Sequence, residues 1–210
     1  VTEDAYVPTW GTYVTTPVVN EKYAKVVLNT KLATAKGADR SAYRIVTEIK
    51  DPNGKIVAKE ENKLSVYNEC QFEQEFAVAT PALWSVENPF LYTAESKIYA
   101  GNTLKDEYTT RFGIRTLEII PEKGFFLNGK LTKFKGVCNH HDLGPLGAAV
   151  NDAAIRRQIR IMKDMGVNAI RTSHNMPAPE LVAACDEMGM MLMLESFDEW
   201  KSAKVSNGYN

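Results

Sequence analysis

The chain contains three histidines, and all three follow short apolar stretches in its last third. His140 and His141 follow residues 134–138 after one intervening residue, and His174 follows residues 168–172 in the same way. A stretch with helical periodicity, residues 153–165, lies between them. This order predicts a β-α-β unit, in which polar residues at the carboxyl ends of parallel strands are the usual location of chemistry. We therefore look for function in the last third of the chain.

The types of these residues favour a sugar site over a metal site. His140 and His141 are adjacent, and neighbouring residues of a strand point to opposite faces, so the two cannot easily bind one ion. Asn139, Arg171 and Glu195 lie at similar strand ends. Convergent donors and acceptors suit a polyhydroxylated ligand, because each sugar hydroxyl both donates and accepts. A structural role for the histidines, and a simple salt bridge for Glu195, remain as alternatives.

The first half of the chain alternates apolar and polar residues with a period of two. The clearest runs are residues 24–28, 43–49, 72–78 and 92–98, and turn-forming Gly, Asn, Asp and Pro fall between them. Roughly seven short strands in ~100 residues are typical of an antiparallel sandwich of the immunoglobulin type.

After Pro121 the pattern changes to alternating strands and helices. Asn128–Gly129 predicts a tight hairpin turn within residues 124–130. The segments that follow predict three strands and two helices: a strand at 132–138, a helix from Asn151 to Gly166, a strand at 168–172, a helix at 179–189 and a strand at 190–194. A complete β/α barrel takes ~250 residues. We therefore predict a truncated barrel, with the strand at 190–194 apolar because both of its faces are covered.

Composition narrows the possible functions further. The 210 residues carry 25 Lys and Arg against 26 Asp and Glu, which disfavours nucleic acid, and no apolar run is long enough for a membrane span. Arg156, Arg157 and Arg160 fit the solvated face of an amphipathic helix. The three cysteines show no disulfide or metal spacing and are expected to be half-buried thiols: Cys70, Cys138 and Cys185. The chain begins at Val1 without a targeting signal, so the choice between bacterial periplasm and cytoplasm stays open, as does the oligomeric state.

Six blocks of this sequence resemble glycoside hydrolase family 2, the family of β-galactosidases and β-glucuronidases. They cover nearly the whole chain in the family's order: residues 83–92, 110–116, 135–142, 171–175, 185–189 and 194–200. The resemblance implies an immunoglobulin-like β-sandwich domain at 1–117, followed at 118–210 by the first β/α units of a truncated TIM (β/α)8 barrel. The details at His140–Gly144 and Gly147–Ala149 are closer to β-galactosidases.

The resemblance also implies roles for individual residues. His140 and His174 match histidines that bind the glycone, and Asp198 and Trp200 are expected to line the same sugar pocket. His141 replaces an acidic residue of many relatives, so its role is open, and its loss should matter less if it faces away from the pocket. Three residues are expected to support the site: Asn139, Arg171 and Glu195.

No catalytic residue is expected within these 210 residues. The family's acid/base follows the fourth barrel strand and its nucleophile lies near the seventh, which makes a paired role for Glu195 and Glu199 improbable. The family's magnesium site includes an acidic residue with a nearby histidine after strand three, but Glu199-Trp-Lys201 lacks that histidine. We therefore predict no metal and no cofactor.

The resulting prediction is a fragment of a retaining exo-glycosidase that hydrolyses terminal β-galactosides and is inactive alone. Its partner would be a β-linked galactoside or related oligosaccharide. A β-glucuronidase or another family 2 glycosidase is the alternative enzyme. A non-catalytic carbohydrate-binding or docking module is the alternative of another class, and it predicts clustered exposed aromatics such as Tyr6, Trp10 and Tyr13.

Overall fold

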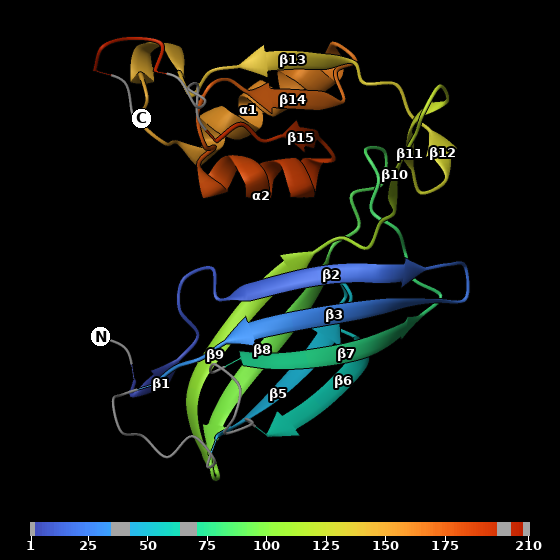
Figure 1. Ribbon diagram of the computed structural model, residues 1–210, viewed down its shortest axis with the longest axis vertical. Helices are drawn as coiled ribbons and strands as arrows, with labels where there is room; N and C mark the ends of the chain where they lie inside the picture. Colours follow the sequence, from blue (N-terminus) through green and yellow to red (C-terminus); the bar gives the residue numbers. More distant parts are fainter. Residues whose placement is uncertain (1–2, 35–42, 64–70, 197–202, 208–210) are drawn as a thin grey trace. The chain divides into compact units, whose positions relative to one another are not determined.

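The computed structural model describes residues 3–34, 43–63, 71–196 and 203–207. These residues form two compact units, each described by itself below (Figure 1). The first unit takes residues 1–84 and 90–117, and the second takes residues 85–89 and 118–210. The short segment Ser85–Pro89, which we assigned from sequence to the first domain, thus packs with the second unit.

The first unit is an antiparallel sandwich of seven main strands in two sheets. One sheet has the order β2-β3-β7 and the other the order β6-β5-β8-β9. The bounds are β2 Thr12–Val19, β3 Tyr23–Lys31, β5 Tyr43–Lys50, β6 Ile56–Lys63, β7 Gln71–Ala79, β8 Tyr92–Ala100 and β9 Thr103–Phe112. Two further short strands, β1 Ala5–Tyr6 and β4 Ala33–Thr34, pair with each other. The immunoglobulin-type sandwich predicted from the period-two pattern is confirmed.

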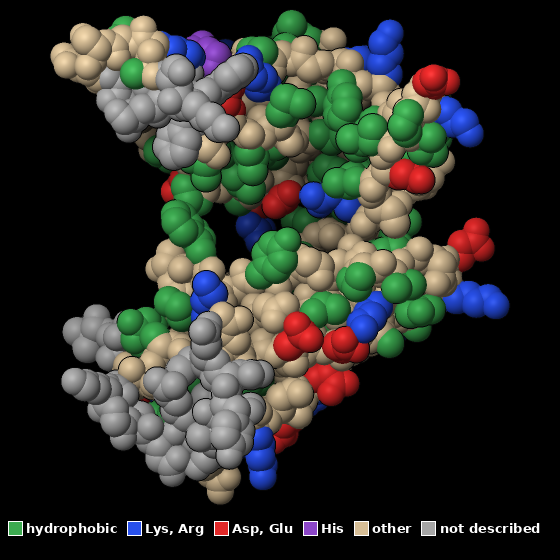
Figure 2. Space-filling model, in the orientation of Figure 1, with side chains coloured by type: hydrophobic (Ala, Val, Ile, Leu, Met, Phe, Trp, Pro, Cys, Tyr) green, Lys and Arg blue, Asp and Glu red, His purple; other side chains and the backbone are tan. Residues whose placement is uncertain are grey.

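Alternation along each strand builds the core of this sandwich. Every second residue of β3, β5, β7 and β8 is buried, and these side chains pack into two apolar clusters. Thr47, Gln74 and Ser96 are also buried, and Thr47 Oγ1 donates to Gln74 Oε1 at 2.6 Å and contacts Ser96 Oγ at 2.9 Å. Mutual hydrogen bonding offsets the desolvation of these polar groups. On the face shown in Figure 2, acidic and basic side chains of the sandwich are interspersed.

A small three-stranded sheet opens the second unit. Its strands are β10 Leu117–Ile120, β11 Gly124–Leu127 and β12 Lys130–Leu131. Asn128 and Gly129 have φ angles of 53° and 74°, as a tight hairpin turn requires, so the predicted turn is confirmed.

The rest of the second unit is a β-α-β-α-β arrangement with a parallel sheet. Its elements are β13 Gly136–Asn139, α1 Asp152–Asp164, β14 Ala169–Thr172, α2 Pro179–Met188 and β15 Met191–Met193. The register aligns Val137, Ile170 and Leu192 on one sheet face, where they pack with Ile155 and Ile159 of α1 and with residues of α2. Both helices therefore cover the same face of the sheet (Figure 1), as in a β/α barrel.

Two predicted strands are shorter in the structure than in the sequence analysis. β13 begins at Gly136 rather than Thr132. The reason is that the Asn168 side chain, and not a neighbouring strand, bonds the backbone before Gly136: Nδ2 donates to Lys133 O at 2.9 Å, and Lys135 N donates to Oδ1 at 2.8 Å. β15 is buried at Met191, but Met193 is 65% exposed. The expectation that the third strand is covered on both faces is therefore wrong at Met193 within the described residues, whereas Met191, on the same face of the strand, is buried.

Candidate functional site

Three predicted site residues come together just beyond the carboxyl ends of the three parallel strands. His140 follows β13 directly, His174 lies two residues after β14, and Glu195 lies two residues after β15. The rings of His140 and His174 meet edge to face, with centroids 5.6 Å apart. Together with Arg171 of β14 these residues form what we call the strand-end cluster.

The His174 ring is held by Glu195. Its Nδ1 lies 2.9 Å from Glu195 Oε1. An ionised carboxylate can only accept, so Nδ1 carries the hydrogen and donates it. The 3.5 Å approach of Arg171 Nη2 to the same nitrogen is then a contact without hydrogen bonding. In the neutral ring this tautomer leaves Nε2 as an acceptor.

Arg171 and the backbone hold Glu195 in turn. Arg171 Nη2 lies 2.7 Å from Glu195 Oε2, and the Glu195 backbone N–H donates to Thr172 Oγ1 at 2.9 Å. Apart from this ion pair, the buried Oε2 has no hydrogen-bond partner within the described part of the chain. The hydrogen bond from His174, followed by the Arg171 charge, holds the pKa of the Glu195 carboxyl below its usual value. Glu195 is therefore an ionised group that orients its neighbours.

Cys138 belongs to this cluster, although sequence reasoning did not place it there. The parallel register pairs Cys138 with Arg171, and Arg171 Nη1 lies 3.5 Å from Cys138 Sγ. Hydrogen bonds from Arg171 and Ser173 lower the pKa of this exposed thiol, whereas burial raises the pKa of Cys185 to about 12. The expectation of half-buried thiols is thus wrong for both: one is exposed and one is fully buried, while Cys70 lies outside the described residues. Only the strand register, which no single motif reveals, could have indicated the Cys138–Arg171 contact.

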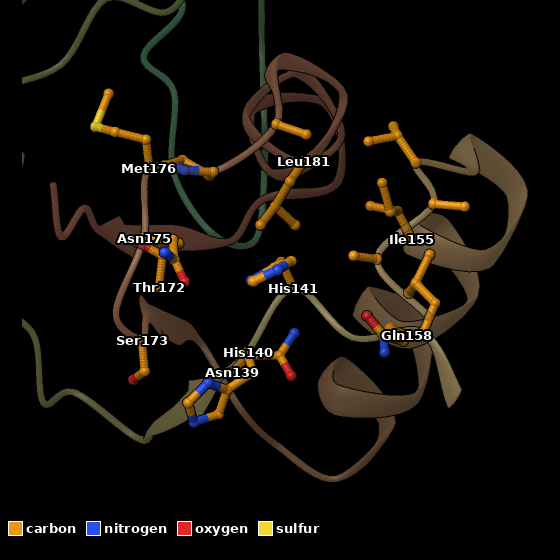
Figure 3. Close-up of a pocket in the computed structure, with 16 residues that line it drawn as sticks. Asn139, His140, His141, Ile155, Gln158, Thr172, Ser173, Asn175, Met176 and Leu181 are labelled. Carbon is orange, nitrogen blue, oxygen red and sulfur yellow. The ribbon is translucent and has the colours of Figure 1, made fainter. Parts of the chain in front are cut away.

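A cavity of about 340 Å³ lies beside the strand-end cluster. Asn139 and His140 contribute to its lining, and so does His141. Figure 3 shows the His141 ring turned toward Leu181 and Ile155, whereas the His140 ring lies on the other side, toward Ser173. The two histidines thus diverge, as expected for neighbouring residues. His141 thus lines this cavity, and its place relative to the sugar pocket stays a prediction.

Three residues with an expected role lie outside the described residues. Asp198 and Trp200 are expected to line the sugar pocket, and Glu199 belongs to the segment compared with the family's magnesium site. Within the described ranges, no three His, Cys, Asp or Glu residues gather as a metal site would need, and no helix is long and apolar enough to cross a membrane. The Ser173–His174 peptide bond is cis.

The fold and the strand-end cluster define a class: an immunoglobulin-like sandwich followed by the start of a β/α barrel with a polar site at its strand ends. The family model "Glycosyl hydrolases family 2" matches residues 6–115, and "Glycosyl hydrolases family 2, TIM barrel domain" matches residues 119–208. The chain belongs to glycosyl hydrolase family 2.

Proteins similar to this chain include both beta-galactosidases and beta-glucuronidases. A beta-galactosidase from Bacteroides ovatus is 44% identical over 95% of this chain and 24% of its own length. A beta-glucuronidase from Bacteroides fragilis is 30% identical over 88% of this chain and 27% of its length. The crystal structure of a family 2 member from Bacteroides cellulosilyticus superposes with a TM-score of 0.91 at 38% identity, covering 98% of this chain and 27% of that one. The chain spans about a quarter of the length of the curated relatives.

Proposed function

We propose that this chain is part of a retaining exo-glycosidase that hydrolyses terminal β-galactosides, and that it supplies glycone-binding residues. The observation that carries the proposal is the strand-end cluster, in which the His140 and His174 rings adjoin and Glu195 and Arg171 fix one of them. The 44% identity to a beta-galactosidase supports the choice of glycone.

In this proposal the chain's own residues recognise sugar hydroxyls. His174 Nε2, left as an acceptor by the Nδ1–Glu195 hydrogen bond, would accept from one hydroxyl, and His140 would bond another. Glycoside hydrolysis proceeds through an oxocarbenium-like transition state, and hydrogen bonds to ring hydroxyls strengthen as it forms. Arg171 and Glu195 would act as positioning residues, because they keep the His174 ring in one orientation before substrate arrives.

Glu195 is not the missing acid of this reaction. A general acid on a glycosidase needs a raised pKa so that it is protonated at working pH. The pKa of Glu195 is shifted the other way by His174 and Arg171. We assign the two catalytic carboxylates, as the resemblance to the family implies, to parts of the barrel outside this chain.

The proposal is tested by expressing the full-length protein that contains this chain. It should hydrolyse 4-nitrophenyl β-galactoside with retention at the anomeric carbon and prefer it to the β-glucuronide. A preference for the glucuronide would move the protein to the other enzyme class among its relatives. Absence of turnover on both glycosides, with the protein folded, would refute the glycosidase proposal.

A sugar-binding module remains the second candidate because three aromatic side chains among the described residues of the sandwich are exposed: Trp10, Tyr13 and Tyr23. Trp10 is 79% exposed and Tyr13 is 68% exposed, whereas Tyr6 is half-buried. Tyr13 of β2 pairs with Asn29 of β3, and Tyr23 lies six residues from Asn29 along β3. The rings of Tyr13 and Tyr23 are therefore on the order of 20 Å apart. The exposed aromatics are thus spread along the sheet. Binding of galacto-oligosaccharide to the chain that disappears in Trp10→Ala would favour the module.

A further inference from the structure

The cavity beside the strand-end cluster has a different chemistry from the cluster itself. Most of its lining is apolar side chain, contributed by the loop after β13, the loop after β14 and the first turns of both helices. Leu143, Ala149, Ile155, Met176 and Leu181 are the main apolar members. At about 340 Å³ it falls within the range of small-molecule sites, which are mainly apolar with a few polar groups. Such walls do not suit a second sugar ring, whose hydroxyls would lose their hydrogen bonds to water.

The cavity adjoins the proposed glycone site at His140. Asn139 and His140 line it, and His140 also meets the ring of His174. A ligand that touches His140 in the strand-end cluster is therefore within contact distance of the cavity.

The position of the cavity matches the leaving-group side of an exo-glycosidase. Ile155 and Gln158 lie in the first two turns of α1, and Leu181 is the third residue of α2, so the cavity lies at the same end of the unit as the strand carboxyl ends. In β/α barrels this is the end at which substrates enter and leave. A glycone held by the histidines would direct its aglycone toward this rim.

We infer that this cavity binds an apolar, ring-bearing aglycone, so that the enzyme's preferred substrates are aryl or arylalkyl β-glycosides rather than glycosides of another sugar. This inference rests on the proposed function. His141 has a defined place in it. Its ring turns toward Leu181 and Ile155 and offers a flat polarisable surface against which an aromatic aglycone can stack (Figure 3).

The test compares benzyl and methyl β-galactosides on the full-length protein. Both leaving groups are simple alcohols of similar acidity, so the ratio of their kcat/KM values reports contacts of the ring and not leaving-group chemistry. Burial of several carbons should make this ratio at least ~10 in the unmodified enzyme. Ala149→Phe fills the cavity from an exposed loop position, and it should reduce the ratio toward ~1.

Two further variants keep the test decisive. Leu146→Phe adds bulk to the same loop outside the cavity lining, and it should leave the ratio within about twofold of the unmodified enzyme. Met176→Ala trims an exposed wall residue and should reduce the ratio even if Ala149→Phe does not fold.

The outcomes separate the inference from the proposed function. A ratio near 1 in the unmodified enzyme, or one that neither cavity variant changes, overturns the aglycone site while the galactosidase remains. If only the matching β-glucuronides are turned over, the same ratio measured on them decides the aglycone site, and the galactoside proposal alone fails. If neither glycoside pair is turned over, the proposed function fails and the inference fails with it.

Discussion

At the scale of single residues, the orientation of each side chain in the strand-end cluster is set by the residues that it bonds or contacts. His174 is fixed through Nδ1 by Glu195, and Glu195 is fixed by Arg171 and by its backbone bond to Thr172. His140 reaches the same place from another strand and touches His174 edge to face. The His174 ring held in this way is preorganised for a ligand, which is the condition under which a hydrogen bond contributes most to catalysis.

Loss of either histidine should therefore impair the full-length enzyme strongly. We expect His140→Ala and His174→Ala each to reduce kcat/KM for methyl β-galactoside by ~100-fold or more, the scale of a lost transition-state hydrogen bond. His141→Ala should reduce it much less, because its ring turns toward the apolar cavity. Steady-state kinetics on folded variants checks this, and equal losses for all three histidines would contradict it.

The lowered pKa of Glu195 predicts an acid-sensitive contribution to stability. A carboxyl whose folded pKa lies below its unfolded value of ~4.3 stabilises the fold above that pH, and the contribution is lost as pH falls through the lowered pKa. The difference in unfolding free energy between the chain and Glu195→Gln should thus be present at pH 7 and shrink below about pH 4. Urea unfolding monitored at several pH values measures it.

Arg171→Met provides the companion variant. It removes the Arg171 charge, which lowers the Glu195 pKa, so the acid-sensitive part of the stability should become smaller. A pH dependence that stays the same in both variants would show that this ion pair is not its source.

The sequence indicated the histidines, Arg171 and Glu195 because each stands at a strand end, a position that hydrophobic patterning reveals. The sequence did not indicate which side chains these residues contact. The Cys138–Arg171 contact and the Thr172–Glu195 bond depend on strand register, which is a tertiary property. The apolar side chains that the His141 ring meets, Leu181 and Ile155, come from the two helices, and this contact is also a tertiary property.

At the scale of elements, the segment Ser85–Pro89 from the first half of the sequence packs against the carboxyl end of α2 in the second unit. Lys163 of α1 donates to the carbonyl oxygens of Val86 and Gly189, each at 3.1 Å, and to that of Met188. A positive charge at this position also complements the helix dipole of α2. Gly189 caps α2 in the left-handed region, and a Cβ at this position would stand 2.3 Å from Val86 O.

Alanine substitutions at two glycines of similar backbone conformation, Gly166 and Gly189, distinguish the stability cost of backbone strain from that of a steric clash. Gly166→Ala, at φ 85° with open space around the added methyl group, should destabilise the chain by ~1 kcal/mol through backbone strain alone. Gly189→Ala, at φ 71°, carries similar strain and also collides with Val86, so it should destabilise by clearly more, ~2–4 kcal/mol. Urea denaturation of the two variants measures the difference. Equal losses would indicate that Ser85–Pro89 does not pack closely on α2.

Element positions were more predictable than element lengths. Asn151 was expected to cap α1, and its side chain accepts from Ala154 N at 3.0 Å. Pro179 and Gly189 delimit α2 as predicted, because Pro and Gly act through local backbone geometry. The start of β13 was predicted too early, since the side chain of Asn168, 33 residues from Lys135, satisfies the backbone there.

At the scale of the whole chain, the sequence indicated both units because each has its own period of hydrophobicity. The sandwich follows from period two, and the β-α-β-α-β unit follows from apolar strands separated by helical periods. The assignment of Ser85–Pro89 could not be predicted in this way. Five residues without periodicity give no signal of where they pack.

Because we assign glycone binding to this chain and the catalytic carboxylates to other parts of the barrel, we predict that these 210 residues alone hydrolyse no β-galactoside. His140 and His174 can bind a glycone, but Glu195 is held ionised by its neighbours and no catalytic carboxylate pair is assigned to this chain. Loss of both carboxylates of a glycosidase removes most of its rate enhancement, on the order of many powers of ten. Incubation with 4-nitrophenyl β-galactoside against a matched blank checks this. Turnover that follows the purified chain and vanishes in Glu195→Gln would contradict it and would make Glu195 catalytic.

The parallel sheet of the second unit should be the least protected part of the isolated chain. Within the described residues β15 is three residues long and pairs only with β14, and Met193 and Leu194 are 65% and 54% exposed. Parallel sheets are normally covered on both faces, and open apolar edges invite association with other chains. We expect amide hydrogens of residues 190–194 to exchange far faster than those of β5 and β8 at the centre of their sheet, or the chain to self-associate through this edge. Hydrogen exchange combined with a gel-filtration mass distinguishes these cases. Strong protection of residues 190–194 in a monomer would contradict both, and it would show that the second unit is a stable small fold without further strands.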